Sequence, residues 1–511
     1  MSDSPSLVFL WTDQQAPQTI AAYGNDRIET PNLDALADAG TTFERAYCTS
    51  PVCTPSRSSV MTGKYPHTTG VTGNNIPLGP DDATFAEIVG DDYVTGWIGK
   101  WHLGDEIFRQ RGFDEWVATE DQYRPFYSES RPENAHSEYH EFLVEQGYEP
   151  DQVEDDGYEW FSREFVASTV PEEHSKPKFM ADAAIDFIER HCDEPFVLHV
   201  MFLEPHDPYT SPRDDQYDPA DVELPPNFDH DGLDDQPLRY RFAREAIRRG
   251  ISRRAPDTME TPPTRDDWRD VISRYWGLVS LVDTHVGRIL DTLDSEGLTD
   301  ETITVFTSDH GDMMGSQGLY TKMVQFEESI RVPLILRLPD GTASGERIET
   351  PVSQIDLVPT LLDAMDQSAP DRLGLQGQSW LPLLRDESGL DERNVFVEWN
   401  GANFHGAFGR RPVEHAEETR PGLTPEATDL ADEMGVTETE VMHAYTDPAR
   451  TVVTPEGWKL TYRRSGTHEL YDLDDDPGEI NNLADRRPDV VEELYGEIVD
   501  WQVRTRDPIY L

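Results

Sequence analysis

The chain has 511 residues, 36% of them hydrophobic and 10% aromatic, so it can bury a large core. Its 43 basic and 100 acidic residues give a net charge of −57, which excludes nucleic acid and anionic membranes as partners by repulsion. No stretch approaches the ~20 apolar residues of a membrane span, and Met1–Pro5 lacks the basic start of a signal peptide. We therefore expect a cytoplasmic protein, and its three cysteines do not indicate a disulfide framework.

The cationic residues are almost all arginine, because the sequence has only six lysines. An acid-rich, lysine-poor chain resembles the proteins of extreme halophiles, in which molar salt screens the self-repulsion. An acidic disordered protein is the alternative, but the aromatic residues and apolar runs favour a folded chain. The composition therefore predicts a halophilic globular protein.

Four short apolar runs predict buried strands, at residues 7–11, 93–98, 196–203 and 303–307. They alternate with helical patterns through about residue 385, which is typical of a large, mostly parallel sheet flanked by helices. Apolar residues at helical spacing over 275–293 predict an amphipathic helix directly before the last of these strands.

The remaining segments predict how the chain is divided. Polar and acidic excursions at 120–180, 205–268 and 401–446 are expected to wall a pocket. The periodicity weakens near 370–395, and hairpin-like runs follow. We predict an α/β domain over residues 1–385 and a smaller α+β domain with antiparallel hairpins over residues 386–511.

Each of the four predicted strands is followed by chemically active side chains. They are Asp13-Gln14, Lys100-Trp101-His102, Glu204-Pro205-His206 and Asp309-His310-Gly311, in chain order. Ligands bind beyond the carboxyl ends of the strands in open α/β sheets. The four strand ends together therefore predict one site.

Two of these strand ends offer metal ligands. Asp13, Gln14 and Asp309 provide oxygen atoms, and His310 provides a nitrogen. Such donors suit Ca²⁺, Mg²⁺ or Mn²⁺. A helix N-cap is the alternative for a lone Asp after a strand, but the adjoining His favours a metal site at Asp309.

The segment that begins at Cys53 predicts a helix with the thiol at its start. Pro55 suits the first turn, and a helix N-terminus favours a negatively charged sulfur or oxygen. Arg57, one turn later, could pair with a tetrahedral oxyanion. Judged by itself, the motif favours a buried structural thiol at Cys53 over a catalytic one.

These segments together resemble the formylglycine-dependent sulfatases of the alkaline-phosphatase superfamily. The Cys-x-Pro-Ser-Arg run at 53–57, followed by Thr62-Gly63, resembles the family motif whose cysteine is oxidised to an aldehyde. Further similar segments are Gly99–Gly104, Glu204–Pro208, Ser308–Asp312 with Lys322, and Glu469–Leu473 with residues 476–483. The resemblance spans nearly the whole chain.

The resemblance implies an alkaline-phosphatase-like sandwich and a sulfuric ester hydrolase. It implies one divalent cation, with Ca²⁺ favoured, and 3-oxoalanine (formylglycine) made from Cys53 by a formylglycine-generating enzyme. The implied substrate is a small-molecule or glycan sulfate ester.

The resemblance also assigns roles to residues, listed here by kind. The implied catalytic residues are Cys53, Arg57, Lys100, His102, His206 and Lys322; the substrate-binding residues are Asn74, Lys100, His206 and Lys322; and the metal ligands are Asp13, Gln14, Cys53, Asp309 and His310. His206 and Lys322 would assist the leaving oxygen, and His102 would act as the base that releases sulfate. We expect Cys53 and Lys322 to face solvent.

Two departures from the usual sulfatase pattern are Gln14, where an Asp is common, and His310, where an Asn is common. Both are similar to the choline-sulfatase and phosphonate-monoester-hydrolase branch, in which an Asn like Asn74 enters the site. A phosphonate or phosphate mono- or diester hydrolase is therefore an alternative, because its transition state needs the same charges. A catalytically inactive sulfatase-like binding protein is the other.

Overall fold

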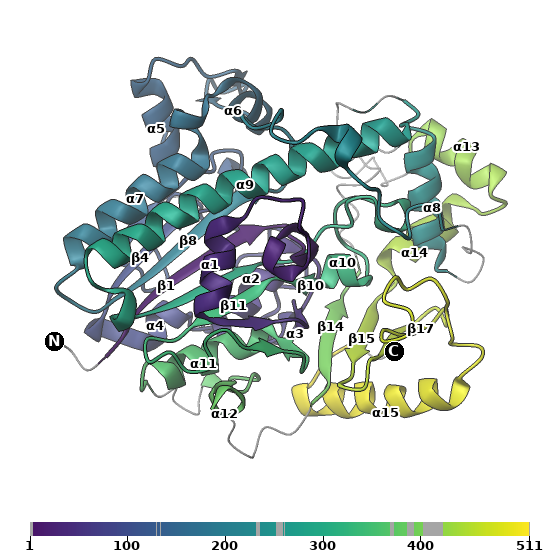
Figure 1. Cartoon of the computed structure of the whole chain (residues 1–511). Coiled ribbons are helices and arrows are strands. Elements are labelled where there is room, and N and C mark those ends of the chain that lie inside the picture. The colour runs from purple at the N-terminus through teal and green to yellow at the C-terminus, as the bar shows by residue number, and fades with distance from the viewer. Residues whose placement is uncertain are drawn as a thin grey trace.

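The computed structural model describes residues 4–128, 130–132, 134–230, 236–251, 259, 261–367, 373–385, 393–401, 423–509 and 511. The described residues form an eight-stranded sheet in the order β12-β2-β11-β9-β1-β8-β4-β5 (Figure 1). Its strands are β1 (Ser6–Asp13), β2 (Thr41–Phe43), β4 (Val94–Gly99), β5 (Glu115–Val117), β8 (Phe196–Pro205), β9 (Thr302–Ser308), β11 (Leu334–Arg337) and β12 (Arg347–Ile348). The four predicted strands are β1, β4, β8 and β9, so all four predictions are confirmed.

The four strands that carry the predicted site residues are neighbours and run the same way. β1 pairs in parallel with β8 and with β9, and β4 pairs in parallel with β8. Their carboxyl ends therefore share one edge of the sheet. Only β11 pairs antiparallel with its neighbours in this described sheet, through β2 and β9.

Alternation along β1 shows how the sheet is covered on both faces. Val8 and Leu10 belong to a core cluster with α1 (Pro31–Ala39), α7 (Lys176–His191) and α9 (Arg265–Ser295). Leu7, Phe9 and Trp11 belong to the opposite cluster, with α2 (Cys53–Thr62), α4 (Phe85–Val89), α11 (Leu357–Ala364) and α12 (Leu381–Leu384). The sheet is thus the middle layer of a three-layer sandwich, and α9 contains the predicted amphipathic helix.

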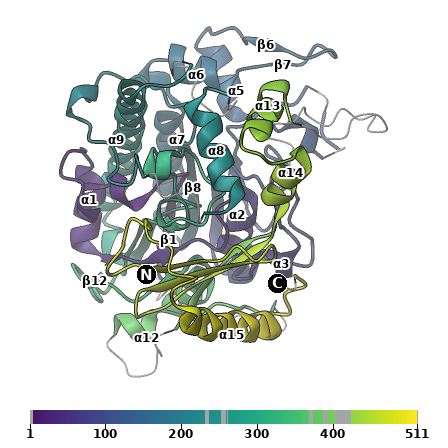
Figure 2. The same ribbon diagram turned by 90° about the vertical axis from the view of Figure 1, so that its right-hand side faces the viewer.

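A second, antiparallel sheet lies near the C-terminus, in the order β14 (Val395–Trp399), β15 (Ala449–Val453), β16 (Trp458–Arg463) and β17 (Glu469–Asp472). Helix α15 (Pro488–Thr505) packs on it through Leu494, Ile498 and Trp501, which contact Leu460 and Leu470 in one core cluster (Figure 2). The predicted fold class, a mostly parallel sheet flanked by helices and a smaller antiparallel sheet, is confirmed. The boundary at 385/386 stays a prediction, because residues 386–392 lie outside the described residues.

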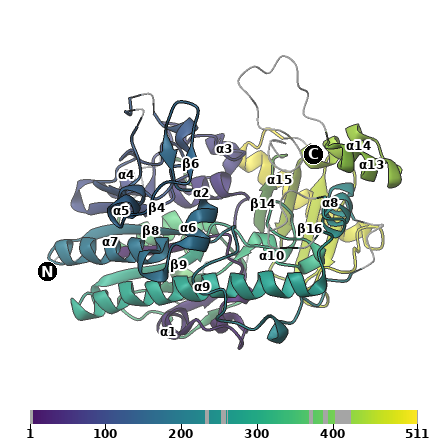
Figure 3. The same cartoon turned by 90° about the horizontal axis from the view of Figure 1, so that it is seen from above.

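The excursions hold the remaining elements. Between β5 and α7 lie α5 (Glu138–Glu145), the hairpin β6 (Gln152–Val153) and β7 (Glu159–Trp160), and α6 (Arg163–Thr169). This part lies at the opposite end of the molecule from α15 (Figure 2). Further elements are α3 (Pro66–Thr69), α8 (Leu238–Arg248), α10 (Glu327–Ile330), α13 (Pro425–Glu433), α14 (Glu438–Thr446) and the short strands β3 (Ala46–Tyr47), β10 (Arg331–Val332) and β13 (Val352–Ser353). Helices α8, α13 and α14 pack together, seen from above in Figure 3.

None of the described helices has the length and apolar character needed to cross a bilayer.

Candidate active site

Side chains from three elements meet at the carboxyl edge of the sheet. Donor atoms of Asp13, Cys53, Asp309 and His310 all lie within 4.8 Å of one another, and all four residues are buried. Cys53 Sγ is 3.3 Å from His310 Nε2 and 3.8 Å from Asp13 Oδ1, and His310 Nε2 is 3.4 Å from Asp309 Oδ1. The strand ends after β1 and β9 therefore meet the start of α2.

Arg57 locks the two carboxylates in place. Its Nε donates to Asp309 Oδ2 at 3.0 Å, one terminal nitrogen donates to Asp13 Oδ2 at 2.8 Å, and the other donates to the Lys100 carbonyl oxygen at 2.8 Å. The side chain is fully buried. Because each guanidinium nitrogen has a protein partner, Arg57 orients the carboxylates instead of standing free toward an incoming oxyanion.

The two carboxylates differ electrostatically. Burial and the Cys53 sulfur oppose ionisation of Asp13, but Lys100, 2.6 Å away, and Lys322 outweigh them and hold its pKa well below the usual value. Burial and the Asp13 charge raise the pKa of Asp309. Arg57 already places positive charge beside both buried carboxylates, and a divalent cation on their other oxygens would add to it.

Cys53 begins α2 and lies among cations. Burial raises the pKa of its thiol, but Lys322, Lys100 and His310 outweigh burial and hold it well below the ordinary value. Lys322 Nζ donates to Cys53 Sγ at 3.0 Å. The expectation that Cys53 and Lys322 face solvent is wrong, because they are only 2% and 8% exposed; the chain segments around the sheet edge cover them.

The backbone start of α2 is held by an asparagine from outside the helix. Thr54 N–H donates to Asn74 Oδ1 at 3.1 Å, because Val52, at the N-cap, has no side-chain acceptor. Asn74 therefore lies at the start of α2. The next residue, Asn75, was not predicted as a site residue, and it contacts His102, the predicted base.

His102 is oriented by two neighbours. Its Nε2 lies 2.8 Å from Asn75 Oδ1, so Nε2–H donates and Nδ1 carries the lone pair. The ring also interacts with the Cys53 thiol. Its ring packs on Tyr123 at 4.5 Å between centroids. Burial and Lys100 lower the pKa of His102 to about 3, so the ring is neutral.

Gln14 has a fixed amide orientation. Its Nε2 donates to Tyr209 Oη at 2.8 Å and to the Asp312 carboxylate, which can only accept. Its Oε1 is therefore turned away from Asp312, and it is buried without a partner among the described residues. Tyr209 and Asp312 were missed as site residues, although both adjoin segments with recognisable motifs.

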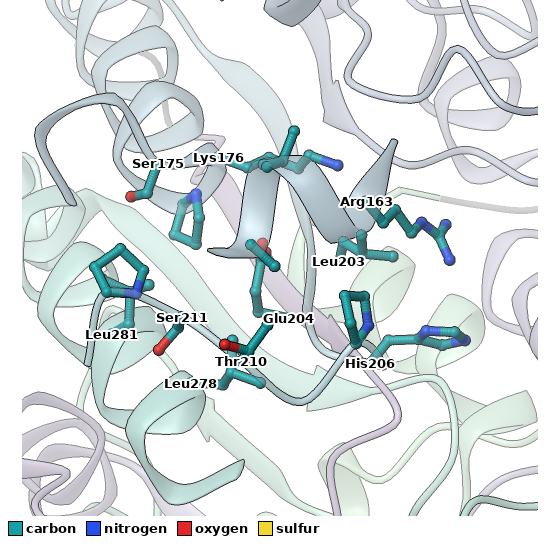
Figure 4. Close-up of a pocket in the computed structure, with 15 residues that line it drawn as sticks. Arg163, Ser175, Lys176, Leu203, Glu204, His206, Thr210, Ser211, Leu278 and Leu281 are labelled. Atoms are coloured by element: carbon teal, nitrogen blue, oxygen red, sulfur yellow. The ribbon is translucent and has the colours of Figure 1, made fainter. Parts of the chain in front are cut away.

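His206 lies at one end of a pocket of about 430 Å³, including its open mouth (Figure 4). Its Nδ1–H donates to the Asp207 carbonyl oxygen at 2.8 Å, which leaves Nε2 for a ligand. The side chain is 12% exposed, and its charge helps to lower the pKa of Asp13. Arg163 lies at the same end of the pocket as His206 in Figure 4.

Of the excursions expected to wall a pocket, only some residues are described. Tyr123, Phe126 and Tyr127 of the 120–180 excursion line a second cavity, of about 550 Å³ with its mouth, together with Asn75 and His102. Residues 402–422 of the third excursion lie outside the described residues.

Comparison with known proteins agrees with this geometry. A family model described as Sulfatase matches residues 5–367. The uncharacterized sulfatase YidJ of Escherichia coli is 29% identical over 99% of this chain and 88% of its own, and the choline-sulfatase of Rhizobium meliloti is 27% identical over 94% and 82%. The structure of the phosphonate monoester hydrolase SpPMH from Silicibacter pomeroyi superposes with a TM-score of 0.75 at 24% identity, covering 99% of this chain and 96% of that one, and so shares the alkaline-phosphatase-like fold. The chain therefore belongs to the sulfatase family, whose members are sulfuric ester hydrolases.

Proposed function

We propose that this sulfatase cleaves R–O–SO₃⁻ at a formylglycine derived from Cys53, beside one divalent cation held by Asp13, Gln14, Asp309, His310 and the side chain at position 53. The observation that carries the proposal is the meeting of four ligand atoms within 4.8 Å, with Lys322 3.0 Å from Cys53 Sγ.

The residues fit a hard cation. Three of the donors are oxygens, the Asp309 pKa is raised by burial and Asp13, and Gln14 Oε1 is a buried acceptor with no partner among the described residues. We favour Ca²⁺ because of the oxygen donors, with Mn²⁺ and Mg²⁺ as alternatives. A bound cation would supply Lewis-acid polarisation and charge neutralisation at the sulfuryl oxygens.

The chain's own residues divide the remaining work. Formylglycine supplies, when hydrated, hydroxyl groups for attack on sulfur and for release of sulfate. Lys100 and Lys322 place ammonium charge beside position 53, where negative charge grows on the sulfuryl oxygens. His206, whose Nδ1 bond to the Asp207 carbonyl oxygen leaves Nε2 available, would protonate the leaving alcohol oxygen. His102, held by Asn75 through Nε2, would take the proton at Nδ1 during sulfate release.

The substrate is a small-molecule or glycan sulfate ester. The aromatic wall of Tyr123, Phe126 and Tyr127 beside His102 suits the face of a sugar or aryl ring. Asn74, at the start of α2, is a further candidate for substrate contact beside Lys100, His206 and Lys322.

The maturation test is the mass of the tryptic peptide from Ala46 to Arg57, from protein made with and without a formylglycine-generating enzyme. Conversion replaces the CH₂SH group of Cys53 by CHO. Cys48, in the same peptide, is an internal control, because it lies outside the Cys-x-Pro-Ser-Arg run at 53–57. We expect one alkylated cysteine with the maturation enzyme and two without it. Two alkylated cysteines in fully active protein would overturn the proposal.

The reaction test compares an aryl sulfate with an aryl phosphodiester, with Cys53→Ala as the inactive reference. We expect the sulfate to have the higher kcat/KM. A higher value for the phosphodiester would favour the phosphoester or phosphonate alternative, since both transition states carry charge on equatorial oxygens. No turnover of either by matured, metal-loaded protein would favour a binding protein.

A further inference from the structure

A second group of metal-ligand side chains lies in the 120–180 excursion, away from the residues assigned to catalysis. Donor atoms of Asp121, His136 and His140 all lie within 4.8 Å of one another. The group arises from how α5 begins. Ser137, at the N-cap, gives its backbone N–H to Asp121 Oδ1 at 2.8 Å and its hydroxyl to Oδ2 at 2.6 Å. The histidines on either side of Ser137, one just before the helix and one in its first turn, are thereby brought to the carboxylate.

The imidazoles are not satisfied by this arrangement. Nδ1 of His136 and Nδ1 of His140 are both buried and have no hydrogen-bond partner among the described residues. The His136 Nδ1 to Asp121 Oδ1 distance is 3.7 Å, which is beyond hydrogen-bond range. The two rings stack at 3.8 Å between centroids, and His140 is only 5% exposed. Two buried lone pairs or N–H groups left unpaired are costly unless a ligand joins them.

The Asp121 carboxylate accepts from Ser137 and, at 3.1 Å, from Tyr158 Oη, and it retains a lone pair for a cation.

We propose that Asp121, His136 and His140 form a second metal site, for a borderline transition-metal dication such as Zn²⁺. Two imidazoles and one carboxylate are a common zinc set, with the remaining position open to water, whereas the oxygen-rich catalytic group suits harder cations. The site joins the segment after β5 to α5.

The position of the site suggests what it does. Asp121 follows Glu120, which pairs with Arg163 and Lys176. Asp121 is also two residues before Tyr123, and the ring of Tyr123 packs on His102. A metal at Asp121 therefore fixes the chain that carries Tyr123 to helix α5. Its role is structural, and it stabilises one wall of the substrate cavity.

The test counts Zn²⁺ by equilibrium dialysis against Ca²⁺-loaded wild-type protein, His136→Gln and His140→Gln. Zinc that displaces the catalytic cation binds to the wild type and to both variants. The difference in bound zinc between the wild type and each variant therefore reports only the second site. We expect each variant to bind one Zn²⁺ per chain at least about 100-fold more weakly than the wild type, because a direct ligand is lost. The matched control is His443→Gln, at an exposed helical histidine, and it should bind zinc as the wild type does.

Two further readouts keep the test decisive. Zinc should slow amide hydrogen exchange over residues 118–145 in the wild type and not in the variants. The side chain of His136 is 16% exposed, so its replacement should disturb folding less than replacement of the buried His140. If His140→Gln does not fold, His136→Gln still provides the comparison with the wild type. Equal zinc content and affinity in wild type and both folded variants would overturn the proposal.

Discussion

Replacing Lys322 by alanine tests the electrostatics of the site. Lys322 Nζ lies 3.0 Å from Cys53 Sγ and 3.6 Å from Asp13 Oδ1, with the side chain 6% exposed. At an effective dielectric constant of about 20, an ammonium at that first distance attracts a unit negative charge by ~5.5 kcal/mol. Only the increase in this attraction between the ground state and the transition state accelerates the reaction. One such donor typically contributes about 3–4 kcal/mol. We therefore expect kcat to fall by ~10²–10³-fold, with a smaller change in KM.

The assay is initial-rate hydrolysis of an aryl sulfate by matured, metal-loaded enzyme, with urea unfolding of each variant. In the Lys322→Ala variant Asp13 retains its ion pairs with Lys100 and Arg57, so the fold should persist. Lys64→Ala is the matched control, because Lys64 pairs with Asp82 at 2.8 Å outside the site. If Lys322→Ala and Lys64→Ala, both folded, have the same kcat, the reasoning is refuted.

Three further predictions follow from the buried charges. Arg57→Ala leaves Asp309 without its guanidinium partner and should lower the free energy of unfolding by about 3–5 kcal/mol in urea titration; an unchanged midpoint would contradict the locking role. Burial and Glu327 raise the pKa of Glu479 to about 8, so its contribution to stability is present below its usual pKa and is lost as pH rises toward 8. Glu479→Gln should therefore flatten the fall in unfolding free energy between pH 5 and pH 8, and an equally steep fall in the variant would count against this. Chelation should abolish turnover and Ca²⁺ should restore it, and turnover that survives chelation would exclude the proposed cation. The metal affinity measured by calorimetry should weaken as pH falls, because the raised pKa of Asp309 lets protons compete with the metal for its carboxylate.

The sequence could predict the strands and the edge where the site lies, for a physical reason. Strands buried on both faces are continuous apolar runs, and the run at 7–11 became β1 (Ser6–Asp13) with its ends shifted by one or two residues. Parallel strands place the residues after them at one edge, so Asp13 and Asp309 meet although they are far apart in the chain. Local pattern and sheet geometry were sufficient for both.

Partners of individual side chains could not be predicted, because they depend on tertiary placement. The sequence pattern leaves Arg57 free for an oxyanion, whereas its three nitrogens bond to two carboxylates and a carbonyl. Nothing in the pattern around Asn75 indicates that it orients His102. Asp121 and His140 come together through a helix cap, which no spacing between them reveals.

Most of the lysines are buried and do not offset the negative charge of the surface. Four of the six are buried beside carboxylates: Lys100, Lys176, Lys322 and Lys459. Only Lys64 and Lys178 remain for the described surface, so its cations are almost all arginines. The buried lysines lie where a compact ammonium contacts a carboxylate. A net charge of −57 then leaves strong self-repulsion, which decays over about 10 Å at 0.1 M salt and about 3 Å at 1 M.

We expect the unfolding free energy, and kcat/KM for an anionic ester, to rise steeply from dilute buffer to molar KCl. Salt weakens both the repulsion within the folded chain and the repulsion of the approaching substrate. In the proposed mechanism the bound ester lies among Lys100, Lys322 and the cation. The two lysines are buried, so screening by salt is weak there and kcat should change little while the protein is folded. Denaturant titrations and initial rates across a KCl series measure both. Full stability and undiminished kcat/KM in dilute buffer would refute the halophilic interpretation. The sulfatase assignment would stay intact, because it follows from the match to the family model and not from the response to salt.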